Sequence, residues 1–219
     1  KNGLHKIAAL WLYDKTSTAN DGSNPFVYSC TRLISSDDPC HPAEDMFSYI
    51  ESVLTALGIK WGLTHNEVKV TPSGDIRLIE INARQHNTYF EPLCQACIGY
   101  NAFDMCLSAY LGSNDVQDPE NDFEQAPRFP TLGYNGAVVH LACFVGGEVT
   151  QINHIQEIEQ MESVVCLEIY PDYEVGSIVS KTKDIRTDCG WIHLIHGDKL
   201  KVMDDYRNIC ILMRTMFEV

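Results

Sequence analysis

The sequence has 219 residues, of which 45% are hydrophobic and 21% are charged, a composition typical of globular proteins and unlike that of disordered or collagen-like chains. Thirty acidic residues against sixteen Lys and Arg give a formal net charge of -14. Because no basic run stands out that could neutralise phosphates, we expect no binding to nucleic acid. No apolar run approaches the roughly 20 residues of a membrane-spanning helix, so we expect a soluble, cytoplasmic protein without membrane contact.

The first half of the chain predicts two strands, a helix, a hairpin and a second helical segment. Aromatic and β-branched residues at 5–13 and 26–34 predict two strands joined by a long turn-rich loop. Apolar residues at steps of three and four predict a helix over 43–57. A hairpin is expected over about 62–84, and 88–112 is expected to be helical.

The second half predicts short strands and a final helix. Strands are expected over residues 136–145, 164–169 and 190–195. Gly146-Gly147 is expected to form a tight turn, and an amphipathic helix is expected to start at Asp204 or Asp205 and to run through Phe217. The whole pattern predicts an α+β fold with mainly antiparallel sheets.

The nine cysteines are an odd number and follow no repeating framework, so we expect reduced and mostly buried thiols. Cys94 and Cys97 have the CxxC spacing of zinc and redox sites, but a second ligand pair is missing. We interpret this pair as core packing, with a metal or redox site as the alternative.

One segment, GLTHNEVKVTPSGDIRLIEINARQHN at 62–87, combines a hairpin pattern with closely spaced charges. Its turn-forming residues, Pro-Ser-Gly-Asp, lie near the middle. A turn centred between Ser and Gly places Glu67 directly opposite Glu80 on the neighbouring strand. The same register pairs His65 with Asn82, Val68 with Ile79 and Val70 with Arg77. The apolar residues that flank Glu80 and Asn82 predict a buried or half-buried strand.

The opposed Glu67 and Glu80 suggest a cation, because like charges directly opposite each other destabilise a sheet and raise the pKa of one carboxylate. With Asn82 they would form an oxygen-only site of the kind that Mg²⁺ or Mn²⁺ prefers. Arg84 follows two residues later on the same strand face, where a guanidinium could bind a phosphate or a developing negative charge.

These assignments have alternatives. The two glutamates could instead pair with Lys69 and Arg77 on a solvated face. His65 could orient a ligand or contact phosphate, and His86 could contact substrate or cap the next helix. Lys15 ends the first strand beside a loop that could close over a site, or its side chain could lie along the surface. Three other histidines, which have no matching acidic partner in the pattern, are interpreted as structural: His140, His193 and His196.

Glu67 and the later LIEINAR run resemble the C-terminal half of the ATP-grasp family. In that family two Glu and one Asn hold the Mg²⁺ ions that bridge the ATP phosphates, and the Arg stabilises an acyl-phosphate intermediate. The resemblance implies these roles for Glu67, Glu80, Asn82 and Arg84. WLYDK at 11–15 and the C-terminal region are similar to the amino-acid ligase branch, which includes bacterial dipeptide ligases and carnosine-synthase-like enzymes.

The resemblance implies an ATP-dependent carboxylate-amine ligase that uses Mg²⁺ (or Mn²⁺), with an amino acid or small carboxylate as substrate. ATP would phosphorylate the carboxylate, and an amine would attack the acyl phosphate to form an amide. An ATP-grasp enzyme acting on purine-pathway or biotin-type substrates would use the same metal site. The sequence departs from the family at 85–87, where Gln-His-Asn replaces a glycine-containing turn.

The family's N-terminal substrate domain and glycine-rich phosphate loop do not occur in this sequence, so we expect the C-terminal portion of an enzyme. The first residue, Lys1, also suggests a fragment or a processed piece. We predict the C-terminal ATP-grasp lobe at 1–113, a linker at 114–132, and a lid-like subdomain at 133–219. The alternative is a truncated, catalytically silent homologue that acts as a binding or oligomerisation module, and assembly as a homo-oligomer is left open.

Overall fold

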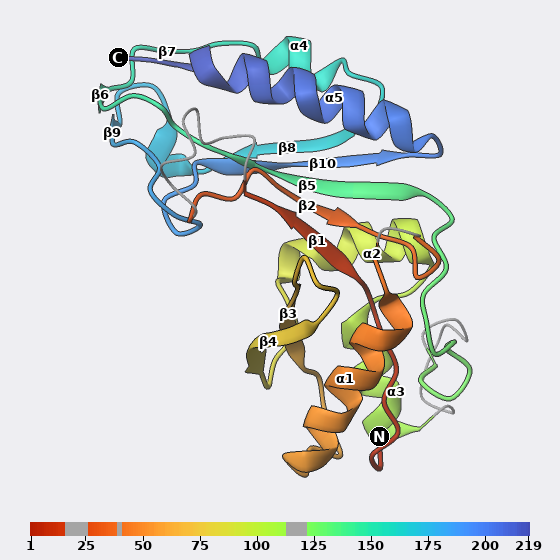
Figure 1. Ribbon diagram of the computed structural model, residues 1–219. Helices are drawn as coiled ribbons and strands as arrows, with labels where there is room; N and C mark the ends of the chain where they lie inside the picture. Colours follow the sequence, from red (N-terminus) through yellow and green to blue (C-terminus); the bar gives the residue numbers. More distant parts are fainter. Residues whose placement is uncertain (16–25, 39–40, 113–121) are drawn as a thin grey trace. The chain divides into compact units, whose positions relative to one another are not determined.

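The computed structural model of the chain describes residues 1–15, 26–38, 41–112 and 122–219 (Figure 1). Its contacts divide the chain into two compact units. The first unit consists of Lys1–Leu10 and Ile34–Gly133, and the second consists of Trp11–Leu33 and Tyr134–Val219. No helix among the described residues is long and apolar enough to cross a membrane.

The first unit contains three α-helices and a hairpin among its described residues. Its elements are α1 (Ala43–Ala56), β3 (His65–Val70), β4 (Ile76–Asn82), the 3-10 helix η1 (Thr88–Phe90), α2 (Glu91–Ile98) and α3 (Ala102–Leu111). The helix predicted over 43–57 is confirmed, and it buries one side, formed by Ala43, Phe47, Ile50 and Leu54. These positions recur every three or four residues, as expected for one face of a helix.

The segment predicted to be helical over 88–112 is divided into several helices. Gly99 ends α2 in a left-handed conformation, with φ +94°, which glycine adopts without a steric penalty. Asn101 then starts α3, since its side chain accepts a hydrogen bond from the Asp104 N–H at 3.0 Å. Together these two residues turn the chain between α2 and α3.

The second unit is built on a five-stranded antiparallel sheet with the order β1-β2-β5-β10-β8. Its strands are β1 (Trp11–Asp14), β2 (Cys30–Leu33), β5 (Asn135–Leu141), β8 (Val164–Ile169) and β10 (Gly190–His196). Smaller elements complete the unit: β6 (Gly147–Glu148), β7 (Gln151–Ile152), α4 (Ile155–Glu159), η4 (Pro171–Tyr173), β9 (Ile178–Val179), α5 (Lys199–Leu212), η5 (Met213–Thr215) and β11 (Phe217–Glu218). The helices α4 and α5 lie along the sheet (Figure 1). The core between these helices and the sheet is apolar. The predicted α+β class with antiparallel sheets is confirmed.

The two units differ from the predicted ranges of 1–113, 114–132 and 133–219. The first two strands, β1 and β2, group with the second unit because β2 pairs directly with β5. The first strand is also shorter than predicted, covering Trp11–Asp14 in place of 5–13. The loop predicted between these strands lies mostly outside the described residues, and so does much of the predicted linker.

Two details of the second unit were wrong in the prediction. Gly146-Gly147 forms no hairpin turn, because β5 ends at Leu141 and Gly147 begins β6, which pairs with β9. The final helix starts at Lys199, after Asp198 accepts a hydrogen bond from the Leu200 N–H at 2.8 Å. It also ends before Phe217, which belongs to β11. A local capping hydrogen bond decides this start, whereas Asp205 faces the core.

Asp205 links α5 to the start of β8, and this contact leads to a stability prediction. Its Oδ2 accepts hydrogen bonds from the Ser163 N–H at 2.9 Å and the Ser163 hydroxyl at 2.7 Å, all within a buried setting. We expect Asp205→Ala to lower the free energy of unfolding by about 1–3 kcal/mol, because two buried donors lose their acceptor. The exposed Asp204→Ala variant is the control, and urea unfolding measures both. Equal stabilities of the two variants would contradict this role.

The described cysteines agree with the expectation of free and mostly buried thiols, and no disulfide joins any of them. Cys94 and Cys97 are both buried in α2. Burial raises the pKa of Cys97 to about 12 and raises the pKa of Cys94 as well. Such thiols remain protonated at neutral pH, which favours the core-packing interpretation over a metal or redox site.

Candidate metal site

The hairpin of β3 and β4 brings the predicted site residues together. The structure confirms the pairing of Glu67 with Glu80 and of His65 with Asn82. The predicted pairs Val68–Ile79 and Val70–Arg77 are wrong: Val68 pairs with Leu78, Lys69 with Arg77, and Val70 with Ile76. A β-bulge lies between the two sets of pairs and leaves Ile79 as the extra residue of β4.

The hairpin is more exposed than the apolar residues of β4 suggested. Ile79 is 59% exposed and Leu78 is 37% exposed, so the prediction of a buried or half-buried strand is wrong for this part of β4. The bulge is supported from one side by α1, where the Tyr49 hydroxyl accepts a hydrogen bond from the Leu78 N–H at 3.4 Å. His65 and Glu67 on β3 are half-buried, in contrast to Glu80.

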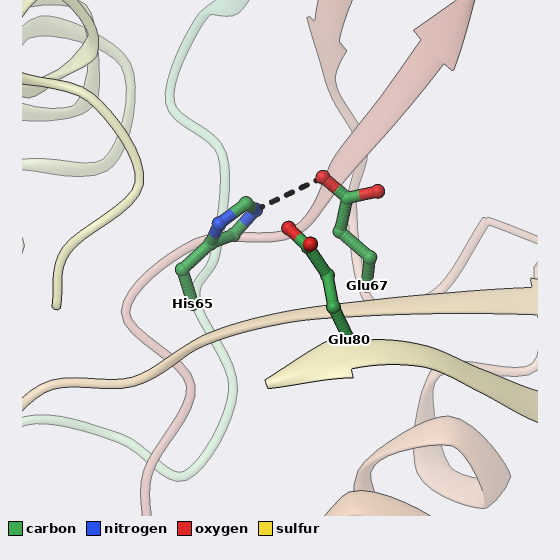
Figure 2. Close-up of side chains that lie close together, drawn as sticks. All are labelled: His65, Glu67 and Glu80. Carbon is green, nitrogen blue, oxygen red and sulfur yellow. Dashed lines mark ion pairs between the residues drawn. The ribbon is translucent and has the colours of Figure 1, made fainter. Parts of the chain in front are cut away.

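His65, Glu67 and Glu80 form a cluster of potential metal ligands (Figure 2). One donor atom of each residue lies within 4.8 Å of the donor atoms of the other two. His65 Nε2 is 3.7 Å from Glu67 Oε1. Figure 2 shows the three side chains pointing toward one another from the two strands. His65 and Glu67 share a face of β3 because residues at i and i+2 of a strand lie on the same side, and Glu80 lies directly opposite.

Asn82 adjoins this cluster. Its Nδ2 donates a hydrogen bond to Glu80 Oε1 at 2.8 Å. The amide therefore holds the Glu80 carboxylate beside Glu67, and a rotation of the amide would present its oxygen in the same place. The three residues predicted as metal ligands, Glu67, Glu80 and Asn82, thus lie next to one another on the hairpin, and His65 is a fourth polar side chain among them.

The imidazole of His65 is held by an aromatic stack. Its ring meets the ring of His86 edge-on with centroids 4.5 Å apart, and His86 stacks on Phe90 at 4.3 Å. Burial lowers the pKa of His65, and Arg84 lowers it further, whereas Glu67 and Glu80 act in the opposite direction. A lowered pKa favours the neutral imidazole at neutral pH, which is the form that binds metal ions. His86 therefore acts here on His65 rather than as a helix cap.

Arg84 lies just beyond the end of β4, so its predicted place on the same strand face is wrong. Its Nη1 donates hydrogen bonds to the backbone carbonyls of Gln85 at 2.8 Å and His86 at 2.6 Å. The side chain folds over its own loop, where Gln-His-Asn replaces the glycine turn. The next residue, Asn87, caps η1 by accepting a hydrogen bond from the Tyr89 N–H at 3.1 Å.

Lys15 belongs to the second unit, unlike the other predicted site residues. Its ammonium group lies over the ring of Tyr28, 4.2 Å from the centroid, and 5.6 Å from the centroid of Tyr13. These contacts are cation–π interactions within that unit. The structure thus gives Lys15 two aromatic neighbours at the end of β1.

Two of the three other histidines have acidic partners, which the sequence pattern did not reveal. His140 Nδ1 lies 3.5 Å from Asp188 Oδ2, and His196 Nε2 lies 3.3 Å from Glu162 Oε1. Asp188 and Glu162 are far from these histidines in sequence, so spacing alone could not pair them. His140 is buried and also shares a 3.0 Å hydrogen bond with the Thr31 hydroxyl, in keeping with a structural role.

Comparison with solved structures identifies the fold of the chain. No family model and no curated protein matches the sequence. An L-amino acid ligase from Bacillus licheniformis matches with a TM-score of 0.72 and 14% identity, over 95% of this chain and 49% of that chain. A phosphoribosylglycinamide synthetase from Anaerococcus prevotii matches with a TM-score of 0.61 and 13% identity, over 88% of this chain and 45% of that chain. Both are ATP-grasp enzymes.

The chain has an ATP-grasp fold. It spans about half the length of the solved structures that it matches and fits the C-terminal half of that fold. A third ATP-grasp structure is the phosphoribosylaminoimidazole carboxylase ATPase subunit from Aquifex aeolicus, with a TM-score of 0.54 and 17% identity, over 93% of this chain and 50% of that chain. The ATP-grasp fold predicted from the LIEINAR run is therefore confirmed.

Proposed function

We propose that this chain is the C-terminal portion of an ATP-dependent carboxylate-amine ligase that acts on an amino acid or a small carboxylate. The observation that carries the proposal is the direct opposition of Glu67 and Glu80 on a hairpin of an ATP-grasp fold. An L-amino acid ligase among the matched structures supports the amino-acid branch. The proposal concerns the activity of the whole enzyme, because the chain spans about half the length of these matches.

The donor set fits a divalent cation such as Mg²⁺ or Mn²⁺. Two carboxylates face each other across the hairpin, and an amide adjoins one of them at 2.8 Å. Oxygen donors of this kind are what hard divalent cations prefer. Two carboxylates directly opposite each other destabilise a sheet, so a cation would remove an unfavourable interaction as well as gain ligands. We assign Glu67, Glu80 and Asn82 to hold it.

The remaining predicted site residues carry N–H donors that suit contact with phosphate oxygens. A bound Mg²⁺ or Mn²⁺ supplies charge neutralisation for the phosphates of ATP. A guanidinium has five N–H donors, and Arg84 uses only Nη1 for its two carbonyl contacts. Its other N–H groups, on Nη2 and Nε, would bind an oxygen of the transferred phosphoryl group. We assign phosphate or substrate contact to His86 and to Lys15, each within its own unit, whereas His65 lies among the residues that would hold the cation.

A catalytically silent homologue that acts as a binding or oligomerisation module is the second candidate. The hydrogen bonds of Arg84 to its own loop favour it, because they occupy part of the side chain proposed to act on the phosphoryl group. Such a module would have no need for metal-dependent nucleotide binding. The two candidates therefore differ in a property that can be measured on this chain.

Calorimetry with Mg²⁺ or Mn²⁺, with and without ATP, tests the proposal. We expect metal-dependent ATP binding by the wild-type chain and its loss in the Glu67→Gln, Glu80→Gln double variant, because both anionic ligands are removed. The matched control is Glu148→Gln, Glu174→Gln, which removes the same charge from two exposed positions in the second unit. Equal binding by all three proteins would contradict the assigned metal site, and equal absence of binding would favour the silent module.

A further inference from the structure

We propose that His65 is a direct ligand of the cation held by Glu67 and Glu80, which makes this a mixed nitrogen and oxygen site that prefers Mn²⁺ to Mg²⁺. The inference rests on the metal site proposed above and adds a ligand and a metal preference to it. The observation behind it is that His65, and not only the two carboxylates, contributes a donor atom to the cluster within 4.8 Å.

The distances allow one ion to contact all three residues. Nitrogen and oxygen ligands lie about 2.0–2.2 Å from a small divalent cation, so two ligands of one ion are at most about 4.4 Å apart. The separation of 3.7 Å between His65 Nε2 and Glu67 Oε1 lies within that limit. The largest separations in the cluster, which do not exceed 4.8 Å, need only a small rotation of the exposed Glu80 side chain.

The surroundings of His65 orient its ring toward the carboxylates. The edge-on contact with His86, itself stacked on Phe90, restricts the imidazole from one side. On β3 the ring lies two residues from Glu67, on the same face, and across the hairpin it lies opposite Asn82. The Nε2 atom consequently points at the gap between the two carboxylates (Figure 2).

An imidazole ligand changes which cation the site selects. Carboxylate, amide and water oxygens suit Mg²⁺, whereas imidazole suits transition metals, and Mg²⁺ loses its water shell reluctantly. Replacing one water ligand by a nitrogen should therefore strengthen Mn²⁺ binding much more than Mg²⁺ binding. The second consequence is spectroscopic, because a ligand nitrogen couples magnetically to the unpaired electrons of Mn²⁺.

Pulsed electron paramagnetic resonance of the chain with Mn²⁺ alone tests this directly. We expect ¹⁴N modulations in the wild-type protein, and we expect them to change to those of ¹⁵N when only histidine is labelled with ¹⁵N. This labelling needs no substitution, so it does not depend on how any variant folds. Bound Mn²⁺ without nitrogen modulations, or with modulations that histidine labelling does not change, would overturn the assignment.

Two variants identify which histidine is involved. His65→Phe keeps an aromatic ring against His86 and should abolish the modulations, with Mn²⁺ affinity lowered by about tenfold or more and Mg²⁺ affinity changed by less than about threefold. His86→Phe keeps the stack on Phe90 and should retain the modulations. If His86→Phe loses the nitrogen modulations and His65→Phe retains them, the proposal is contradicted.

The Glu67→Gln, Glu80→Gln variant distinguishes a failure of the metal site from a failure of the nitrogen ligand. If its Mn²⁺ affinity equals that of the wild type, the metal site itself is wrong, and the role of His65 is wrong with it. If affinity is lost in this variant but the wild-type signal contains no histidine nitrogen, the metal site stands and only the nitrogen ligand is refuted.

Discussion

Glu80→Gln should lower ligase turnover of the complete enzyme by about a hundredfold or more, and should leave the metal-free chain slightly more stable. Turnover falls because one of two anionic metal ligands becomes neutral, and a metal ion contributes several kcal/mol of charge stabilisation in such reactions. Stability rises by about 0.2–1 kcal/mol because the like-charge pair with Glu67 is removed from the hairpin. Gln retains an oxygen that can accept the hydrogen bond from Asn82.

The prediction is specific because turnover should fall while the free energy of unfolding rises. A variant that loses activity by unfolding would lose stability as well, and urea unfolding in the presence of a chelator detects that. The control is Glu148→Gln, at an exposed position in the second unit, which should change neither quantity measurably. Retained turnover in Glu80→Gln would exclude this residue as a metal ligand.

Gly190→Ala should be the most destabilising single substitution considered, with a loss of more than about 3 kcal/mol in the free energy of unfolding. Gly190 begins β10 with φ +152°, a conformation that residues with a side chain rarely adopt. A Cβ atom there would lie 2.0 Å from the backbone oxygen of Glu168 and 2.9 Å from the Cα of Ile169. These are atoms of β8, so relief requires β8 and β10 to separate.

The stability of Gly190→Ala is measured by urea unfolding followed by circular dichroism. Gly197→Ala is the matched control, since Gly197 follows the same strand, is exposed, and has nothing within 4 Å of its added Cβ. We expect the control to remain within about 0.5 kcal/mol of the wild type. Similar unfolding midpoints for the two variants would show that the strands tolerate the extra atom.

Local patterns predicted the parts of the fold that depend on neighbouring residues. The periodic apolar positions of α1 identified the helix, and a turn placed between Ser73 and Gly74 set Glu67 against Glu80. The bulge at Ile79 could not be predicted in this way, because an alternating sequence pattern does not show where a strand contains an extra, unpaired residue. Its presence shifted the pairs nearest the turn and left those near the carboxylates unchanged.

The missed features depend on residues that are distant in sequence. The assignment of β1 and β2 to the second unit follows from the pairing of β2 with β5, about a hundred residues away. The partners of His140 and His196 were missed for the same reason. Within the site, the two-residue spacing from His65 to Glu67 was a usable signal for a shared strand face, whereas the stacking of His86 on Phe90 depends on the path of the loop after β4.

The β-bulge also makes the two ends of the hairpin separately variable. The extra residue, Ile79, shifts the register, so the pairs near the turn are offset by one residue from the pair of Glu67 and Glu80. The loop at 71–75 could be exchanged, or both strands lengthened there by equal numbers of residues, with the carboxylates still opposite each other. Related sequences can therefore diverge in this loop, or acquire an inserted segment there, under little constraint from the cation chemistry.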